Sequence, residues 1–268
     1  MAGLETIGTL VDVYSTAKDG KGILQNIAKW FKTPANILVV GSSGVGKTQF
    51  IQVLRNDSAT TNPLRTTKPE KHTTEIEKIK LVLTDTPGHE HYETILQGTI
   101  AANVTPNMIK DNIFWEHPLA GIINVVAYGY PEEPNINAKH LLLQGSFDEQ
   151  LQKVNIGFLE RNRNMELEHL NYWLPTIAEN SSKVPWIINL INKADIWWDD
   201  ENDVRQYYDT IFSEPFKHLR KDIEIMNIYF CNKVQPYYNK QRSSMFGEQE
   251  KLHLQENFKN KLVSLLSK

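Results

Sequence analysis

The segment Gly41–Thr48, GSSGVGKT, constrains this chain of 268 residues more than any other part of it. It matches the pattern G-x-x-x-x-G-K-[ST] and follows the apolar run NILVV, which is typical of a buried parallel strand. Its glycines let the backbone curl so that successive N–H groups face one point, and a helix that begins there adds the positive end of its dipole. The segment therefore predicts a strand, a phosphate-binding cradle and a helix, in that order.

Two side chains of the cradle carry its chemistry. We expect Lys47 to reach the outer phosphates and the Thr48 hydroxyl to ligate Mg²⁺. The alternative is a glycine-rich turn with a solvated lysine, which the flanking strand and helix patterns argue against. The residues expected to contact a bound nucleotide here are Gly41, Gly44, Val45, Gly46, Lys47, Thr48 and Gln49.

The rest of the chain alternates between apolar runs and helical patterns. Runs typical of buried strands recur at 79–85, 120–128, 185–191 and 223–230. Helical patterns follow the cradle at 50–54 and recur at 147–178, 204–219 and 252–266. Strands that alternate with helices imply right-handed crossovers and a sheet covered on both faces. Residues 34–268 are therefore predicted to form one α/β domain with a doubly wound, mostly parallel sheet.

Residues 1–33 precede this pattern and are predicted to form a helical extension. Their apolar residues recur at helical spacing between 4 and 14 and again between 23 and 31. An amphipathic helix must bury its apolar face. The extension can pack on its own domain, or it can bind a partner protein or a second copy of the chain. A membrane is the least expected partner because the extension carries few basic residues.

Composition excludes several classes of protein. The net charge of −3 is too small to indicate nucleic acid or an anionic membrane as a bulk partner. One cysteine, Cys231, allows neither an internal disulfide nor a cysteine-based zinc cluster. No apolar run approaches the length of a membrane span, and the N-terminal segment lacks the pattern of a signal peptide. We therefore expect a cytoplasmic protein.

Two further motifs stand where later apolar runs end. DTPG follows the run at 79–85, and NKAD follows the run at 185–191. Ligands of open α/β sheets bind at the carboxyl ends of strands, so both motifs are expected beside the cradle. There Asp85 could hold Mg²⁺ through a water molecule, and the Gly88 N–H could meet a γ-phosphate. An ordinary strand-ending turn is the alternative interpretation of DTPG.

In this order, the cradle, DTPG and NKAD resemble the signature of the P-loop GTPase superfamily, which includes Ras-like, Era-like and translation-factor GTPases. The resemblance runs from about residue 35 to the C-terminus. It implies that GTP and GDP are the ligands and that Mg²⁺ is the cofactor. It assigns the guanine base to Asn192, Lys193 and Asp195.

The resemblance extends to two weaker elements. Thr67, within TTKP, has the spacing of the first-switch threonine that meets Mg²⁺ and the γ-phosphate. Other threonines could take that role: Thr60, Thr61, Thr66, Thr73 and Thr74. Cys231, Asn232 and Lys233 stand where relatives carry Ser-Ala-Lys, in a loop that contacts the base. Asn232 replaces the alanine of the family.

His89 follows DTPG directly, as a histidine does in translation factors, where it orients the attacking water. The resemblance thus assigns catalysis to Lys47, Thr67 and His89, with His91 as an alternative to His89. It implies a molecular switch that hydrolyses GTP slowly and meets a protein partner through its switch loops or N-terminal helices. Two alternatives stay open: a GTP-regulated scaffold with little hydrolysis, and a P-loop ATPase in which NKAD is fortuitous.

Overall fold

A computed structural model describes residues 34–57, 69–86, 118–130, 147–179, 184–234 and 246–268, with the backbone alone for 147–158. The predicted N-terminal helices lie outside the described residues. Within the described residues, six strands form one sheet in the order β2-β3-β1-β4-β5-β6. The strands are β1 (Ala35–Val40), β2 (Glu70–Ile76), β3 (Ile79–Asp85), β4 (Leu119–Val126), β5 (Trp186–Ile191) and β6 (Glu224–Tyr229).

All neighbouring strands run parallel except β2, which pairs antiparallel with β3. The predicted doubly wound, mostly parallel α/β fold is therefore confirmed. Strand β2, EKHTTEI, was not predicted because this edge strand has no continuous apolar run and exposes most of its side chains. Two of the candidate switch threonines, Thr73 and Thr74, lie in this strand.

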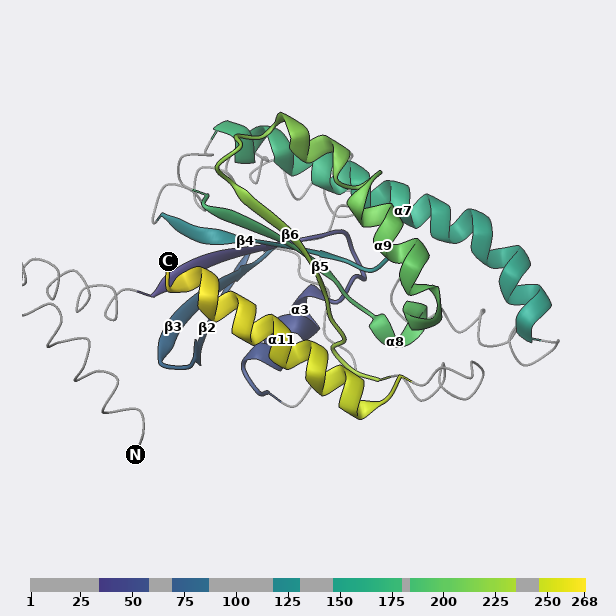
Figure 1. Cartoon of the computed structure of the whole chain (residues 1–268), viewed down its shortest axis with the longest axis horizontal. Coiled ribbons are helices and arrows are strands. Elements are labelled where there is room, and N and C mark those ends of the chain that lie inside the picture. The colour runs from purple at the N-terminus through teal and green to yellow at the C-terminus, as the bar shows by residue number, and fades with distance from the viewer. Residues whose placement is uncertain (1–33, 58–68, 87–117, 131–146, 180–183, 235–245) are drawn as a thin grey trace, which may run out of the picture.

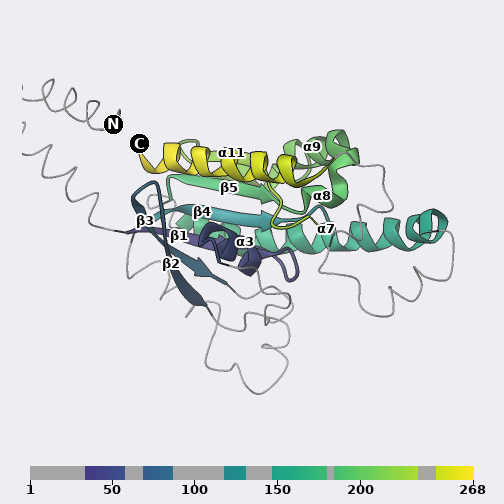
Figure 2. The same ribbon diagram turned by 90° about the horizontal axis from the view of Figure 1, so that it is seen from below.

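Helices cover both faces of the sheet (Figures 1 and 2). On one face lie α3 and α11, and on the other lie α7 and α9. The α-helices are α3 (Lys47–Leu54), α7 (Phe147–Glu179), α8 (Ala194–Trp197), α9 (Glu201–Asp209) and α11 (Glu248–Leu266), and the short 3₁₀ helices are η2 (Trp198–Asp200) and η3 (Glu214–His218).

The helix predicted over 204–219 is wrong in its bounds. The chain is already helical from α8 through η2, so α9 begins at Glu201, three residues earlier than predicted. It ends at Asp209, and η3 follows with Pro215 in its first turn. Proline has no N–H to donate and is tolerated in the first turn of a helix, so Pro215 fits the start of η3 better than the interior of one long helix.

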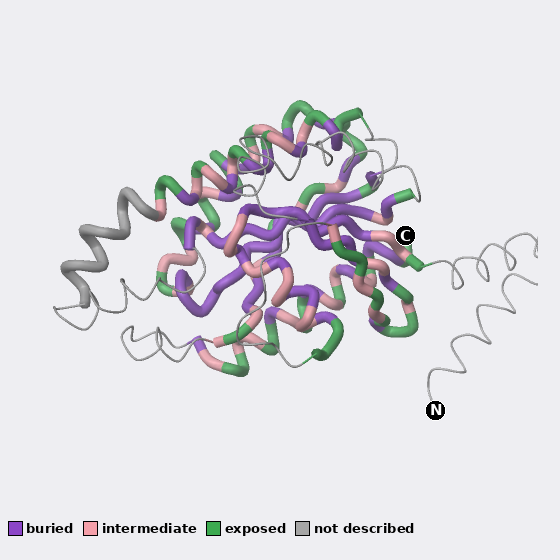
Figure 3. Tube along the Cα trace, turned by 180° about the vertical axis from the view of Figure 1, so that it is seen from behind, coloured by how far each residue is buried: buried purple, intermediate pink, exposed green. Residues whose placement is uncertain are grey.

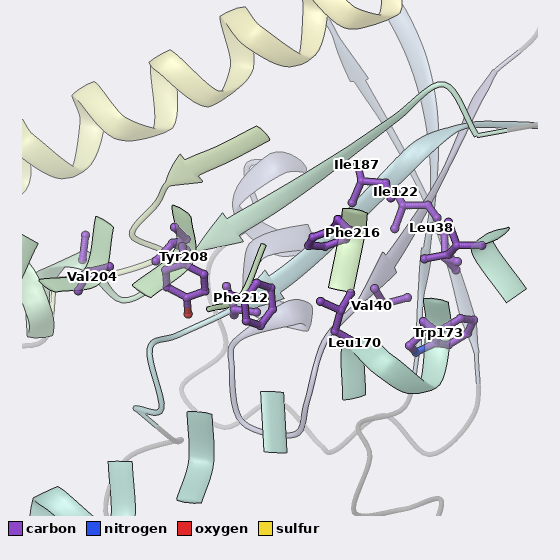
Figure 4. Close-up of a cluster of buried hydrophobic side chains, with 14 of the residues drawn as sticks. Leu38, Val40, Ile122, Leu170, Trp173, Ile187, Val204, Tyr208, Phe212 and Phe216 are labelled. Carbon is purple, nitrogen blue, oxygen red and sulfur yellow. The ribbon is translucent and has the colours of Figure 1, made fainter. Parts of the chain in front are cut away.

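Two apolar clusters hold these layers together, and the buried strands stand out in Figure 3. One cluster joins the sheet to α7, α9 and η3, with Trp173, Tyr208 and Phe212 fully buried (Figure 4). The other joins the sheet to α3 and α11 through Phe50 and Phe258, whose rings meet edge to face at 5.3 Å. Burying a phenylalanine side chain contributes about 1.5–3 kcal/mol, so this aromatic contact fixes α11 against the helix that follows the cradle.

A ladder of polar side chains crosses the first cluster. Asn124 donates to Asn189 (3.2 Å), Asn189 donates to Asn227 (3.0 Å), and Asn227 donates to Asp209 of α9 (2.8 Å). The three asparagines are register partners on β4, β5 and β6. A one-residue slip of any of these strands would leave a buried amide without its partner, so the ladder favours this register.

None of the helices in the described ranges is long and apolar enough to cross a membrane.

Candidate nucleotide-binding site

The motifs singled out in the sequence meet at the carboxyl edge of the sheet. Val39 of β1 is the register partner of Asp85, the last residue of β3. Thr86 continues past β3 and bonds the Val39 carbonyl oxygen through both its N–H (3.2 Å) and its hydroxyl (2.9 Å). Asn192 follows β5, and its N–H donates to the Val126 carbonyl oxygen at the end of β4 (2.8 Å). Segments far apart in the chain therefore converge on the cradle, as predicted.

Gly46 marks the point where the cradle becomes a helix. It precedes α3 with φ of 94°, in the left-handed region that favours glycine. A Cβ atom at this position would come within 2.6 Å of the Asn192 side-chain amide and within 2.7 Å of the Asn232 side-chain amide. The residue must therefore be glycine because of both its backbone conformation and the closeness of the two loops that are predicted to recognise the base.

The NKAD segment holds the cradle by its carbonyl groups. Lys193 Nζ donates to the Gly44 carbonyl oxygen (2.8 Å), and Asn192 Nδ2 donates to the Val45 carbonyl oxygen (2.8 Å). The Asn192 bond is buried, and Lys193 itself is only 9% exposed. These bonds fix the distance between the cradle and the segment predicted to recognise the base.

Asn232 continues the same pattern from the loop after β6. Its Nδ2 donates to the Gly46 carbonyl oxygen (3.0 Å). Three consecutive carbonyl groups, at residues 44–46, are thus held by side chains of the predicted base-recognition loops. In a planar trans peptide the next N–H points opposite to the carbonyl, so the N–H groups of residues 45–47 face away from these loops. That arrangement leaves the N–H groups oriented to bind phosphate oxygens.

Lys47 lies buried at the start of α3. Its Nζ donates to the carbonyl oxygens of Gly41 (2.9 Å) and Ser42 (3.0 Å). Burial lowers the pKa of Lys47 to about 8, although the nearby Asp85 carboxylate opposes this shift. A buried ammonium has lost most of its water, so phosphate oxygens would interact with it strongly.

Thr48 and Asp85 supply oxygen atoms beside this lysine. The Thr48 hydroxyl donates to Asp85 Oδ2 (2.8 Å), and Asp85 is fully buried. A hydroxyl and a carboxylate are ligands that suit Mg²⁺, which usually takes its other ligands from water and phosphates. The donor set therefore fits the metal expected from the sequence.

Asp195 lies at the start of α8 with 3% of its surface exposed. The Cys231 thiol lies 3.4 Å from Asp195 Oδ1 and donates to it. Burial, reinforced by the Asp195 carboxylate, raises the pKa of Cys231 well above its usual value, so the thiol keeps the proton that it donates. Cys231 thus stabilises the Asp195 carboxylate with a hydrogen bond. Lys233, in contrast, is exposed.

The two tryptophans after NKAD pack within the domain. Trp197 is fully buried, and its indole N–H donates to the Asn192 carbonyl oxygen (2.6 Å). Trp198 packs edge to face on Phe246, with ring centroids 5.0 Å apart. These rings therefore hold the NKAD segment in place.

Three of the predicted site residues lie outside the described residues: Thr67, Gly88 and His89. Of the alternative threonines, Thr74 donates to the carbonyl oxygen of Leu54 (3.2 Å), at the opposite end of α3 from Thr48. That position argues against Thr74 as a ligand of the same metal ion.

Sequence reasoning missed a second support of the site. Lys193 Nζ also donates to the carbonyl oxygen of Tyr130 (2.9 Å), in the turn after β4. A buried glutamate of α7, Glu166, accepts hydrogen bonds from that same turn. No motif marks Glu166 in the sequence, since it is one of several acidic residues on a long helix.

Comparison with known proteins agrees with this geometry. Residues 36–154 match the model of a family described as 50S ribosome-binding GTPase. Over these residues the chain is similar to the P-loop GTPase superfamily. The matched part of the chain includes the cradle and Asp85, whereas NKAD lies beyond it.

No curated protein matches this sequence. Among solved structures, it is similar to a GTP-binding protein from the hyperthermophilic archaeon Sulfolobus solfataricus in complex with GDP. The two share 16% sequence identity with a TM-score of 0.44, and the match covers 98% of this chain. It covers 61% of the other chain, so this chain spans less than two thirds of that protein.

Proposed function

We propose that this protein binds GTP and GDP together with Mg²⁺, hydrolyses GTP to GDP and phosphate, and acts as a molecular switch in the cytoplasm. The observation that carries the proposal is the direct bonding of Asn192 and Lys193 to the cradle carbonyls. Because of these bonds, Asp195 and Lys47 belong to one rigid assembly. One ligand that carries both a base and phosphates would satisfy both ends of that assembly.

Base recognition rests on Asp195. An ionised carboxylate only accepts hydrogen bonds, and guanine presents two adjacent donors, N1–H and the 2-amino group. The Cys231 thiol donates to one lone pair of Oδ1, and the other lone pairs of the carboxylate can accept from the base. Adenine offers no such pair of donors, so it would leave this buried charge unmatched.

Phosphate binding rests on the cradle and Lys47. The N–H groups of residues 45–47 and the Lys47 ammonium provide donors and positive charge for the β- and γ-phosphates. Thr48 and Asp85 would hold Mg²⁺, which supplies charge neutralisation to the phosphate oxygens. Lys47 would also stabilise the negative charge that develops as the γ-phosphate bond breaks.

For hydrolysis, we assign to His89 the task of orienting the attacking water by a hydrogen bond. Thr67 and the Gly88 N–H would contact the γ-phosphate, and these contacts would be lost after hydrolysis. A protein partner or a second copy of the chain that meets these segments, or the N-terminal helices, would then distinguish the two nucleotide states. Residues 1–33 would form the extension, and residues 34–268 the GTPase domain.

Single-turnover hydrolysis of GTP tests this function. We expect slow production of GDP and phosphate by the wild type, and loss of both tight binding and turnover in Lys47→Ala. Lys221→Ala removes an exposed lysine far along the chain and serves as the matched control. Tight GTP binding without turnover would support a scaffold instead, and normal binding by Lys47→Ala would show that the cradle does not hold phosphate.

A further inference from the structure

The turn after β4, residues 127–130, is held closely against α7. Tyr128 and Gly129 have positive φ values of 53° and 80°. A Cβ atom on Gly129 would lie 2.3 Å from the carbonyl oxygen of Leu159 in α7, so only glycine fits there. The Gly129 carbonyl oxygen accepts a hydrogen bond from Asn162 of the same helix (2.8 Å). The position of α7 therefore determines the path of this turn.

Glu166 organises the N–H groups of the turn. Its Oε1 accepts from the N–H groups of Ala127 (2.9 Å) and Gly129 (3.1 Å). Its Oε2 accepts from the Tyr208 hydroxyl of α9 (3.1 Å), and that hydroxyl in turn accepts from the Tyr128 N–H (2.9 Å). Glu166 is only 3% exposed, so water cannot easily replace these partners. All three consecutive N–H groups of residues 127–129 thus depend on one buried carboxylate and its tyrosine.

The same turn receives the lysine of NKAD. Lys193 Nζ donates both to the Tyr130 carbonyl oxygen (2.9 Å) and to the Gly44 carbonyl oxygen of the cradle (2.8 Å). The Glu166 carboxylate also attracts the Lys193 ammonium electrostatically. A continuous set of bonds therefore leads from α7 through the turn and Lys193 to the cradle.

We propose that Glu166 is a positioning residue for the nucleotide site, and that its ionisation couples guanine-nucleotide affinity to pH near neutrality. When ionised, the carboxylate accepts from every donor that faces it and attracts Lys193. When protonated, one of its oxygens becomes a donor, and the negative charge that orients Lys193 is lost. The turn then holds Lys193 less firmly, and the cradle loses part of its support.

The surroundings of Glu166 place this change in an accessible range of pH. Burial raises the pKa of Glu166 to about 7, although the hydrogen bonds from the turn and Tyr208 and the charge of Lys193 oppose the shift. From α9, Tyr207 and Tyr208 face the carboxylate, and burial raises the pKa of both, so they stay neutral here. On α7, Arg163 lies over the Tyr128 ring, 4.7 Å from its centroid. Glu166 is therefore the group in this cluster that titrates near pH 7.

The sign of the effect follows from linkage. Nucleotide binding favours the ionised form, so affinity is fully present above the pKa of Glu166 and falls as the pH decreases through it. Glu166→Gln has almost the same shape as the protonated acid and cannot ionise. It should therefore behave at every pH as the wild type does at low pH.

The test is GDP affinity, measured by calorimetry between about pH 6 and pH 8 at fixed Mg²⁺. We expect wild-type affinity to fall roughly threefold to tenfold as the pH decreases from about 8 to about 6, beyond any change that the nucleotide itself contributes. Glu166→Gln should bind at pH 8 more weakly by the same factor and lack this step. Glu168→Gln, at an exposed position of α7, should follow the wild type, whereas the pH dependence that remains in Glu166→Gln gives the contribution of the nucleotide.

A second variant keeps the proposal testable if Glu166→Gln does not fold. Tyr208→Phe keeps the ring and removes one hydrogen bond to the ionised carboxylate, so the midpoint of the affinity profile should move to higher pH. An unmoved midpoint, or a Glu166→Gln profile identical to that of the wild type, would overturn the proposal. The inference rests on the proposed function: absence of GDP binding by the wild type would overturn both, whereas GDP binding with unchanged profiles would overturn this inference alone.

Discussion

The side-chain amide of Asn232 donates a hydrogen bond to the carbonyl oxygen of Gly46 across 3.0 Å, and so joins the loop after β6 to the phosphate cradle. The resemblance to P-loop GTPases predicts an alanine where this chain has Asn232, and an alanine methyl group cannot make that bond. The substitution thus adds a third side-chain bond to the two that NKAD makes to the cradle.

The first prediction follows from this bond. Asn232→Ala should weaken GTP and GDP binding alike, roughly threefold to tenfold, as expected for the loss of one hydrogen bond of about 1 kcal/mol. Preference for GTP over ATP should persist, because Asp195 is unchanged. Asn260→Ala, at an exposed position of α11, is the matched control. Equal affinities of Asn232→Ala and wild type would show that the bond does not support the cradle.

The second prediction concerns pH and Lys47. Its pKa is lowered from 10.5 to about 8 in the protein without nucleotide. Bound phosphates favour the charged lysine, so the contribution of Lys47 to nucleotide affinity should decline as the pH rises above about 8. Titration of GDP affinity between about pH 8 and pH 10 measures this decline.

Folding without nucleotide should respond in the opposite sense. Between about pH 8 and 10.5 the unfolded chain binds more protons at Lys47 than the folded chain does. The contribution of Lys47 to the free energy of unfolding therefore rises with pH in this range. Comparison of denaturant melts of the wild type and Lys47→Met isolates that contribution. A nucleotide affinity that does not change through this range would contradict the assigned role of the ammonium.

Much of this architecture follows from local sequence patterns. Continuous apolar runs predict β1, β3, β4, β5 and β6 because buried parallel strands need apolar side chains on both faces. The cradle and NKAD are short motifs whose residues act together, so their order along the chain indicates where they meet. Edge strand β2 could not be predicted in this way, because its exposed residues leave no apolar run.

Individual side-chain contacts between distant segments could not be predicted from the sequence. Nothing in the local sequence of Glu166 shows that it accepts bonds from a turn 37 and 39 residues away. The Asn232 bond to Gly46 spans 186 residues, and no local pattern predicts it. Such contacts depend on the packing of whole helices and strands, which short motifs do not encode.

The third prediction concerns the metal. Thr48→Ala removes the hydroxyl that donates to Asp85, whereas Thr48→Ser retains a hydroxyl at the same place. With Mg²⁺ present, GDP should bind Thr48→Ala more weakly by at least about tenfold, and Thr48→Ser should stay close to the wild type. With the metal chelated, all three proteins should bind alike. A Thr48→Ala variant that keeps the full benefit of Mg²⁺ would show that Thr48 is not a ligand.

The fourth prediction separates binding from catalysis. His89→Ala should keep its GTP affinity and hydrolyse GTP roughly tenfold to a thousandfold more slowly, as expected when a group that positions water is lost. His91→Ala, two residues away, is the matched control and should retain the wild-type rate. Single-turnover rates of the three proteins decide the matter. A His89→Ala rate equal to that of the wild type would show that another group orients the water.

The last measurement compares GTP, ATP and xanthosine triphosphate in competition for the wild type and Asp195→Asn. The account predicts that the wild type prefers GTP strongly, because ATP would leave the buried Asp195 carboxylate unmatched at a cost of at least about 1–3 kcal/mol. Asp195→Asn should bind GTP weakly and prefer xanthosine triphosphate, because the new amide can donate to the carbonyl that replaces the 2-amino group. Equal binding of ATP and GTP by the wild type, or unchanged GTP affinity in Asp195→Asn, would contradict guanine recognition by this protein.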